Sequence, residues 1–69
     1  MSELSNLPNH PNLEPREVAA FLRVSLAWVY DQIHQKHLPA LKVGPHYRIP
    51  RQKFVDWYEY QQQQLEESV

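Results

Sequence analysis

Residues 24–36, VSLAWVYDQIHQK, decide how this chain folds. Ser25 stands directly before an apolar run with helical periodicity. At such a point a serine hydroxyl accepts hydrogen bonds from the free backbone N–H groups of the first turn. We therefore predict that Ser25 caps a helix. At about 100° per residue, one face of this helix is apolar and should form part of the core: Leu26, Val29, Tyr30 and Ile33.

The opposite face of the same helix is expected to point outward and carries Ala27, Trp28, Asp31 and Gln35. An indole on an outward face has two interpretations. Trp28 either lies against a neighbouring loop or hairpin, as isolated surface apolar residues commonly do, or contacts a partner, such as a thymine methyl group or sugar edge in a major groove.

A shorter helix is predicted before this one, over residues 15–22. Pro15 suits a first turn because its missing N–H would be unpaired there. Val18, Ala19 and Leu22 should line the inner face, and Leu13 should staple the entry. Only the tight turn at residues 23–24 separates the two helices. This is the outline of a helix-turn-helix, although many small bundles share it.

A two-stranded hairpin is predicted after the second helix, which Leu38-Pro39 should stop. Residues 40–43 and 47–49 alternate as strands around a turn at residues 44–46. A three-residue tip places Lys42 opposite Arg48 and turns four apolar side chains inward: Leu41, Val43, Tyr47 and Ile49. Two facing cations cost up to roughly 1 kcal/mol. Either a bound phosphate removes that cost or both side chains splay into water.

A third helix, over residues 51–64, should cover the core with Phe54, Trp57 and Tyr58. The predicted fold class is therefore mainly α: three helices, with a two-stranded β-hairpin wing between the second and third. Residues 1–12, with two prolines and no apolar period, should form a disordered arm. The domain should cover residues 13–60, and residues 61–69 should form a fraying polar tail that could also pair with another protomer.

The composition limits the class of protein further. Sixty-nine residues without cysteine make one small domain in a reducing setting. The start of the chain lacks the features of a signal peptide, and no apolar run approaches the ~18 residues of a membrane span. We expect a soluble cytoplasmic protein that does not associate with membranes.

Charge is distributed unevenly along the chain. All seven Lys and Arg residues lie between positions 16 and 53, where the only acids are Glu17 and Asp31, so this stretch has a net charge of +5 although the whole chain has −1. Such asymmetry favours a polyanionic partner, the alternative being a merely solvated surface.

Enzymatic function is not expected. Ser25 is better explained as a cap, and no His-carboxylate pair activates a nucleophile. His34 and His37 alone do not make a zinc site. We predict no catalytic residue, no metal, no cofactor and no small-molecule substrate.

Five short segments in this order carry a family resemblance: EVA at 17–19, VS at 24–25, VY at 29–30, LPA at 38–40 and YRIP at 47–50. With them the chain resembles the excisionase-type winged helix-turn-helix domains of the MerR-like superfamily. The resemblance implies double-stranded DNA as partner, the second helix in the major groove and the wing on the backbone or minor groove. It also implies a role in DNA recombination or transcription regulation, typical of mobile genetic elements, with a site-specific recombinase or a second copy on DNA as further partners. The candidate DNA contacts are Arg16, Ser25, Ala27, Trp28, Asp31, Gln35, Lys42, His46 and Arg48.

Several residues depart from the pattern of that family. Leu26, Ala27 and Trp28 stand where polar or basic residues are usual, and Asp31 stands where arginine is common. His37 is expected to replace a glycine at the helix end. A second interpretation therefore accompanies the first: a winged helix that uses Ala27, Trp28 and the C-terminal tail to bind a recombinase, a packaging subunit or itself.

Overall fold

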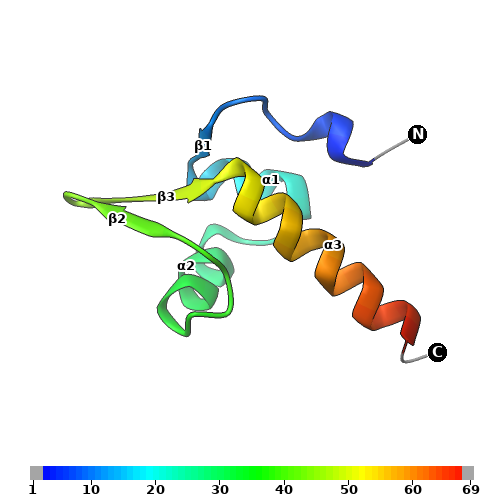
Figure 1. Ribbon diagram of the computed structural model, residues 1–69. Helices are drawn as coiled ribbons and strands as arrows, with labels where there is room; N and C mark the ends of the chain where they lie inside the picture. Colours follow the sequence, from blue (N-terminus) through cyan, green and yellow to red (C-terminus); the bar gives the residue numbers. More distant parts are fainter. Residues whose placement is uncertain (1–2, 68–69) are drawn as a thin grey trace.

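Three helices and a small antiparallel sheet make up the computed structural model, which describes residues 3–67 (Figure 1). The predicted mainly helical fold, with a hairpin between the second and third helices, is confirmed. Positions 1–2 of the expected arm and 68–69 of the expected tail lie outside the described residues. In chain order the elements are η1 (Glu3–Asn6), β1 (Asn12–Leu13), α1 (Pro15–Leu22), α2 (Leu26–His34), β2 (Leu41–Val43), β3 (His46–Pro50) and α3 (Arg51–Glu67).

A basic residue in the left-handed conformation follows each of the helices α1 and α2. Arg23 has φ 59° and Lys36 has φ 62°. After α1, the Val24 N–H donates to the Ala19 carbonyl at 3.0 Å. Such a chain reversal satisfies carbonyls at the end of a helix and usually employs glycine. His37 was expected to take the place of the glycine at the end of α2, but the left-handed residue there is Lys36.

The sheet has the order β1-β3-β2, so the hairpin gains a short third strand that the sequence analysis did not predict. The predicted hairpin register is wrong by one residue. Leu41 pairs with Arg48, Lys42 with Tyr47 and Val43 with His46. The tip therefore has two residues, Gly44 and Pro45. Gly44 has φ 60° and proline holds φ negative, which is the requirement of a type II′ turn.

This register reverses which side of β2 faces the core, because side chains alternate along a strand. Tyr47 and Ile49 face inward as predicted, Ile49 fully buried and Tyr47 half-buried. Leu41 and Val43 were predicted to pack inward, but each is 57% exposed on the outer face. Lys42 and Arg48 consequently lie on opposite faces, so the predicted repulsion between them does not arise.

Five side chains with less than 2% of their surface exposed form the centre of the core: Leu13, Val18, Val29, Ile49 and Phe54. Three of the predicted core positions of α1 and α2 lie around them: Ala19 and Ile33, which are buried, and Leu22, which is partly buried. Leu26 was also predicted to be in the core, but it is 43% exposed. Helical spacing assigns Leu26 to the correct face, yet it occupies the first position of α2 and the core does not extend that far along the axis.

Aromatic side chains join α3 to the rest of the domain. Phe54 stacks on Trp57, with ring centroids 5.6 Å apart, and meets Phe21 of α1 edge-on at 5.7 Å. The Trp57 Nε1–H donates to the His37 carbonyl at 2.7 Å, which fixes the segment after α2. The C-terminal half of α3 then projects away from the domain, opposite the hairpin (Figure 1), and residues 61–65 are exposed.

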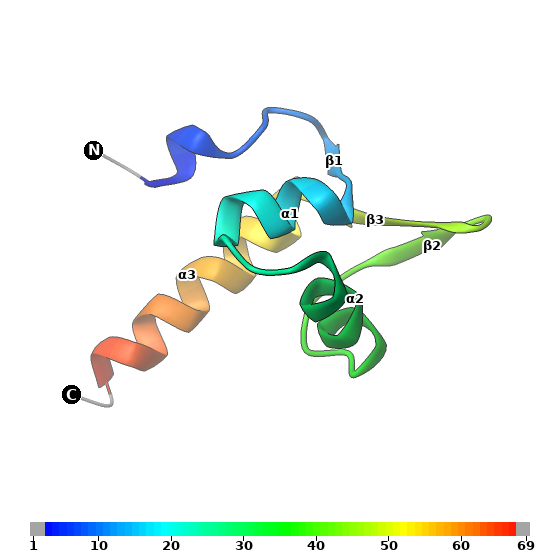
Figure 2. The ribbon, with the colours of Figure 1, turned by 180° about the vertical axis from the view of Figure 1, so that it is seen from behind.

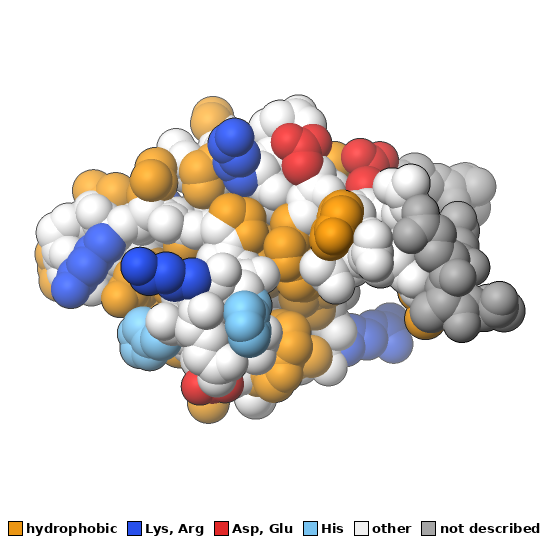
Figure 3. Space-filling view, turned by 60° about the horizontal axis from the view of Figure 1, so that its bottom comes forward, with side chains coloured by type: hydrophobic (Ala, Val, Ile, Leu, Met, Phe, Trp, Pro, Cys, Tyr) orange, Lys and Arg blue, Asp and Glu red, His pale blue; other side chains and the backbone are white. Residues whose placement is uncertain are grey.

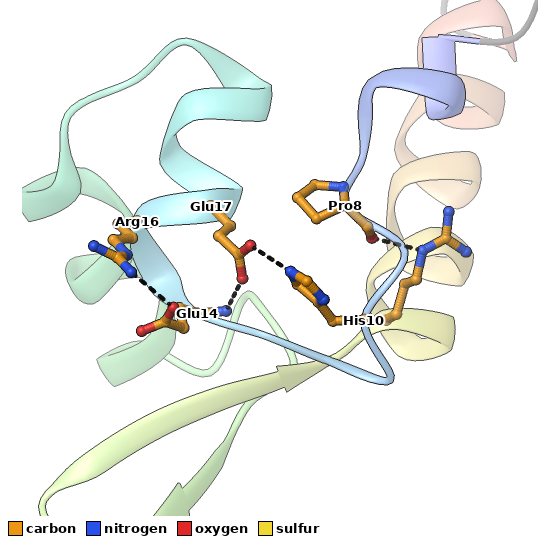
Figure 4. Close-up of polar contacts among 6 residues, drawn as sticks. Pro8, His10, Glu14, Arg16 and Glu17 are labelled. Atoms are coloured by element: carbon orange, nitrogen blue, oxygen red, sulfur yellow. Dashed lines mark hydrogen bonds and ion pairs between the residues drawn. The ribbon is translucent and has the colours of Figure 1, made fainter.

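The segment before α1, expected to be a disordered arm, is attached to the domain in the structure. Leu7 is buried, with 4% of its surface exposed. The Arg51 Nε–H donates to the Pro8 carbonyl at 3.0 Å, and the Arg51 backbone N–H donates to the Pro11 carbonyl at 2.9 Å. His10 Nε2 lies 3.1 Å from Glu17 Oε2 (Figure 4). The same Glu17 carboxylate accepts the Glu14 N–H at the start of α1. These contacts differ from the expectation of disorder over residues 3–12.

Leu7→Ala tests whether this segment is part of the core. We expect the free energy of unfolding to fall by about 2–5 kcal/mol, the range for truncating a buried leucine. Leu41→Ala is the matched control, since the same truncation at an exposed position should change stability by no more than about 0.5 kcal/mol. Urea unfolding followed by circular dichroism measures both. Equal stability of the Leu7 variant and the parent would mean that the segment does not pack on the domain in solution.

Candidate nucleic-acid interface

Helix α2 begins where the sequence predicted, at a serine cap. The Ser25 Oγ accepts the Trp28 backbone N–H at 3.1 Å. Val29 and Ile33 bury the inner face of the helix against α1 and the hairpin. In the view from behind, α2 lies next to α1 across their short connection (Figure 2). Ser25, a predicted contact, therefore has a structural role that sets the start and direction of the outward face.

The first turn of α2 presents an apolar surface. Ala27 is exposed, and Trp28 and Leu26 are 39% and 43% exposed. The predicted outward position of Trp28 agrees with its exposure. Three consecutive apolar residues at the tip of a helix can make van der Waals contact with methyl groups or sugars, or with a protein surface.

Asp31 and Gln35 lie farther along the same face and are bonded to each other. The Gln35 Nε2–H donates to Asp31 Oδ2 at 2.7 Å, across one turn of the helix. Both residues are exposed. This bond uses one oxygen of the carboxylate and one donor of the amide, so the second carboxylate oxygen and the amide oxygen remain as acceptors and the second amide N–H remains as a donor for a partner.

The three predicted hairpin contacts divide between its two faces. His46 and Arg48 lie on the outer face with Val43 and Leu41, their partners across the strands. The Arg48 Nη1–H donates to the Tyr47 carbonyl at 2.8 Å, and a guanidinium has further donors for a ligand. Lys42 lies on the inner face, with its Nζ 5.9 Å from the centre of the Tyr47 ring.

Arg16, the remaining predicted contact, lies on α1 and is paired with an acid. Its Nη2 is 3.1 Å from Glu14 Oε2, and its side chain is 77% exposed (Figure 4). Arg16 lines a hollow between the N-terminal segment, α1 and Tyr58 of α3. It is therefore not grouped with the hairpin residues.

A second hollow lies between the end of α2 and the inner face of the hairpin. Lys42 lines it together with two residues that were not among the predicted contacts, His34 and Lys36. Tyr47 forms its aromatic wall and meets the rings of His34 and Tyr30 at 5.7 and 6.0 Å. Lys36 belonged to the basic stretch in the sequence, but its proximity to Lys42 depends on the way the hairpin folds back.

Charged side chains of both signs are visible on one side of the molecule. Figure 3 shows Lys, Arg and His side chains among apolar ones toward the left of this face, with further Lys or Arg side chains beside acidic ones at the top and at the lower right, and an acidic side chain at the lower edge. Within residues 3–67, no group of three or more His, Asp or Glu is arranged to hold a metal ion. In the same part of the chain, no helix is both long and apolar enough to cross a membrane.

Comparison with known proteins identifies one family. A model described as a helix-turn-helix domain matches residues 13–62, which is most of the chain and includes α1, α2 and the hairpin. No curated protein and no solved structure matches the chain.

Ser25→Ala tests the geometry of the outward face. Loss of the cap should lower the free energy of unfolding by about 1 kcal/mol, because the Trp28 N–H loses its partner. Ser25→Asp retains an acceptor at the same position and should be close to the parent in stability. Thermal unfolding of the three proteins checks this, and equal stability of the alanine variant would contradict the role of Ser25 as a cap.

Proposed function

Because the chain belongs to the helix-turn-helix domain family, which implies DNA binding, we propose that it is a sequence-specific reader of double-stranded DNA. The observation that carries the proposal is the position of α2, whose capped first turn and outward face are free of core contacts beside a hairpin that carries cations. Domains of this class are typically not enzymes.

In the proposed complex, α2 enters the major groove and the hairpin lies on the backbone or in the minor groove. The major groove of B-DNA, about 12 Å wide, admits an α-helix. Ala27 and Trp28 would contact thymine methyl groups or sugars, and Asp31 and Gln35 would lie near base edges. His46 and Arg48 on the outer face and Lys42 on the inner face would contact the backbone, where contacts determine position and affinity but carry no sequence information.

The biological role that we propose is that of an excisionase, which controls the direction of a site-specific recombination reaction, or of a small transcriptional regulator. Either role suits a small DNA-binding domain that works next to another protein. The partner would then be a recombinase, or a second copy of this chain on adjacent DNA, contacted through surfaces that DNA leaves free, such as the exposed end of α3.

A second function is favoured by one observation, the exposed apolar first turn of α2. Leu26 and Trp28 are large apolar side chains where base-reading helices usually carry polar ones. A protein-interaction module would bury this turn against a recombinase or packaging subunit. Binding of labelled duplex at low salt, measured by electrophoretic shift and anisotropy, separates the two functions. If the folded protein binds no duplex, the protein-interaction function is the correct one.

Arg48→Gln tests the contribution of the hairpin to affinity. Removing one phosphate contact should weaken binding to all sequences alike and reduce the slope of log K against log salt concentration by about one unit. Lys53→Gln removes an equal charge from α3, outside both α2 and the hairpin, and should leave the slope unchanged. An unchanged slope in the Arg48 variant would remove that residue from the interface.

Asp31→Asn tests whether the carboxylate on the outward face of α2 repels phosphates or accepts a hydrogen bond from a base. The carboxylate should repel phosphates, so we expect the variant to bind every duplex more tightly and to select the same sites. If Asp31 instead accepts a hydrogen bond from a cytosine N4 amine, the variant should lose about 1–3 kcal/mol of discrimination at one base pair. Selection of binding sites from a random pool, carried out with both proteins, decides between these outcomes.

A further inference from the structure

Lys36 occupies a backbone position at which a lysine is unfavourable. It follows the end of α2 with φ 62°. Its N–H donates to the Ile33 carbonyl at 3.0 Å, and the His37 N–H donates to the Gln32 carbonyl at 2.9 Å. These two bonds define a helix end that requires a left-handed residue, which is usually glycine because a Cβ crowds the backbone there.

The positive charge alone does not explain a lysine at this position. A cation near the C-terminus of a helix is favourable because it faces the negative end of the helix dipole. That benefit is equally available at Gln35 or His37, the two neighbours of Lys36, neither of which has a positive φ. Lys36 differs from both neighbours in the location of its side chain, which the left-handed backbone conformation determines.

That place is the hollow between α2 and the hairpin, which Lys36 lines with His34, Lys42 and Tyr47. No acidic residue lines this hollow. Within residues 3–67, neither Lys36 nor Lys42 forms an ion pair. Lys42 is held over the Tyr47 ring, 5.9 Å from its centre. Two uncompensated ammonium groups thus share one depression, and an anion there would be attracted by both.

We propose that this hollow binds one backbone phosphate of duplex DNA between Lys36 and Lys42, with His34 at its edge. The proposal rests on the proposed function and adds Lys36 to the interface. The phosphate oxygens would accept hydrogen bonds from both ammonium groups, which act as strong phosphate binders. Because one lysine follows α2 and the other belongs to the hairpin, a shared phosphate would fix the hairpin relative to the helix in the groove.

Lys36→Gly makes the central test because stability and binding should change in opposite directions. Glycine relieves the left-handed conformation, so the midpoint of thermal unfolding should rise by roughly 2 to 8 °C. Duplex binding should nevertheless weaken for every sequence, and the log–log salt slope should fall by about one unit. A merely structural lysine would show the rise in stability without the loss of binding.

Arg23→Gly is the matched control, since it relieves the same conformation and removes one charge at the end of α1, where Arg23 lines the other hollow. Each glycine variant is combined with Lys42→Gln, and duplex affinity is measured for all single and double variants. Shared binding of one phosphate predicts that the losses in log K from Lys36→Gly and Lys42→Gln are less than additive. The losses from Arg23→Gly and Lys42→Gln should add.

Three results would overturn the proposal. The first is that the Lys36→Gly variant binds duplex with the same affinity and the same salt slope as the parent. That result would leave the proposed function intact. The second is additive losses for Lys36 and Lys42. The third is an equal loss of affinity and of salt slope in Lys36→Gly and Arg23→Gly, which would show a general effect of net charge and no site at the hollow. Failure of the parent to bind any duplex removes this proposal together with the proposed function.

Discussion

The structure depends on a core to which the three helices and the strands β1 and β3 each contribute one fully buried side chain. Leu13 comes from β1, Val18 from α1, Val29 from α2, Ile49 from β3 and Phe54 from α3. A domain of this size buries only about 60% of the surface that its unfolded chain exposes, so it has little stability in reserve. Because these five residues meet at one centre, the orientations of α2 and the hairpin are fixed by the same contacts that keep the chain folded.

The features predicted correctly from the sequence are those that act between neighbours along the chain. Ser25 bonds three residues away and Pro15 begins α1, so capping rules suffice for both. The attachment of the N-terminal segment was missed because it depends on distant residues. Leu7 reaches the core, and Arg51 binds the carbonyls of Pro8 and Pro11, which lie forty or more positions earlier along the chain. Local composition, rich in proline and asparagine, contains no signal for such contacts.

The hairpin tip has two residues where three were predicted, and this difference changes which side chains of β2 are exposed. Gly44 and Pro45 close a two-residue tip, and the shift places Leu41 and Val43 outside. The outward positions of Trp28 and Asp31 followed from helical periodicity and agree with their exposure. The hollow shared by Lys36 and Lys42 was beyond such reasoning. Its two sides meet only after β2 pairs with β3, and neither lysine has a sequence motif that marks the other.

In the proposed complex, affinity and selectivity would come from different surfaces of the domain. Cations gather on the hairpin and at the end of α2, where contacts with phosphate do not depend on base identity. The exposed face of α2 contains an apolar first turn, followed by Asp31 and Gln35, whose side chains are hydrogen-bonded to each other. Helix α2 contains no arginine or lysine, whereas the commonest specific contacts are donors from these residues to guanine, so we expect it to distinguish few base pairs strongly. Under the proposed function, we therefore expect a short DNA site of modest selectivity, with binding reinforced by a second protein on adjacent DNA.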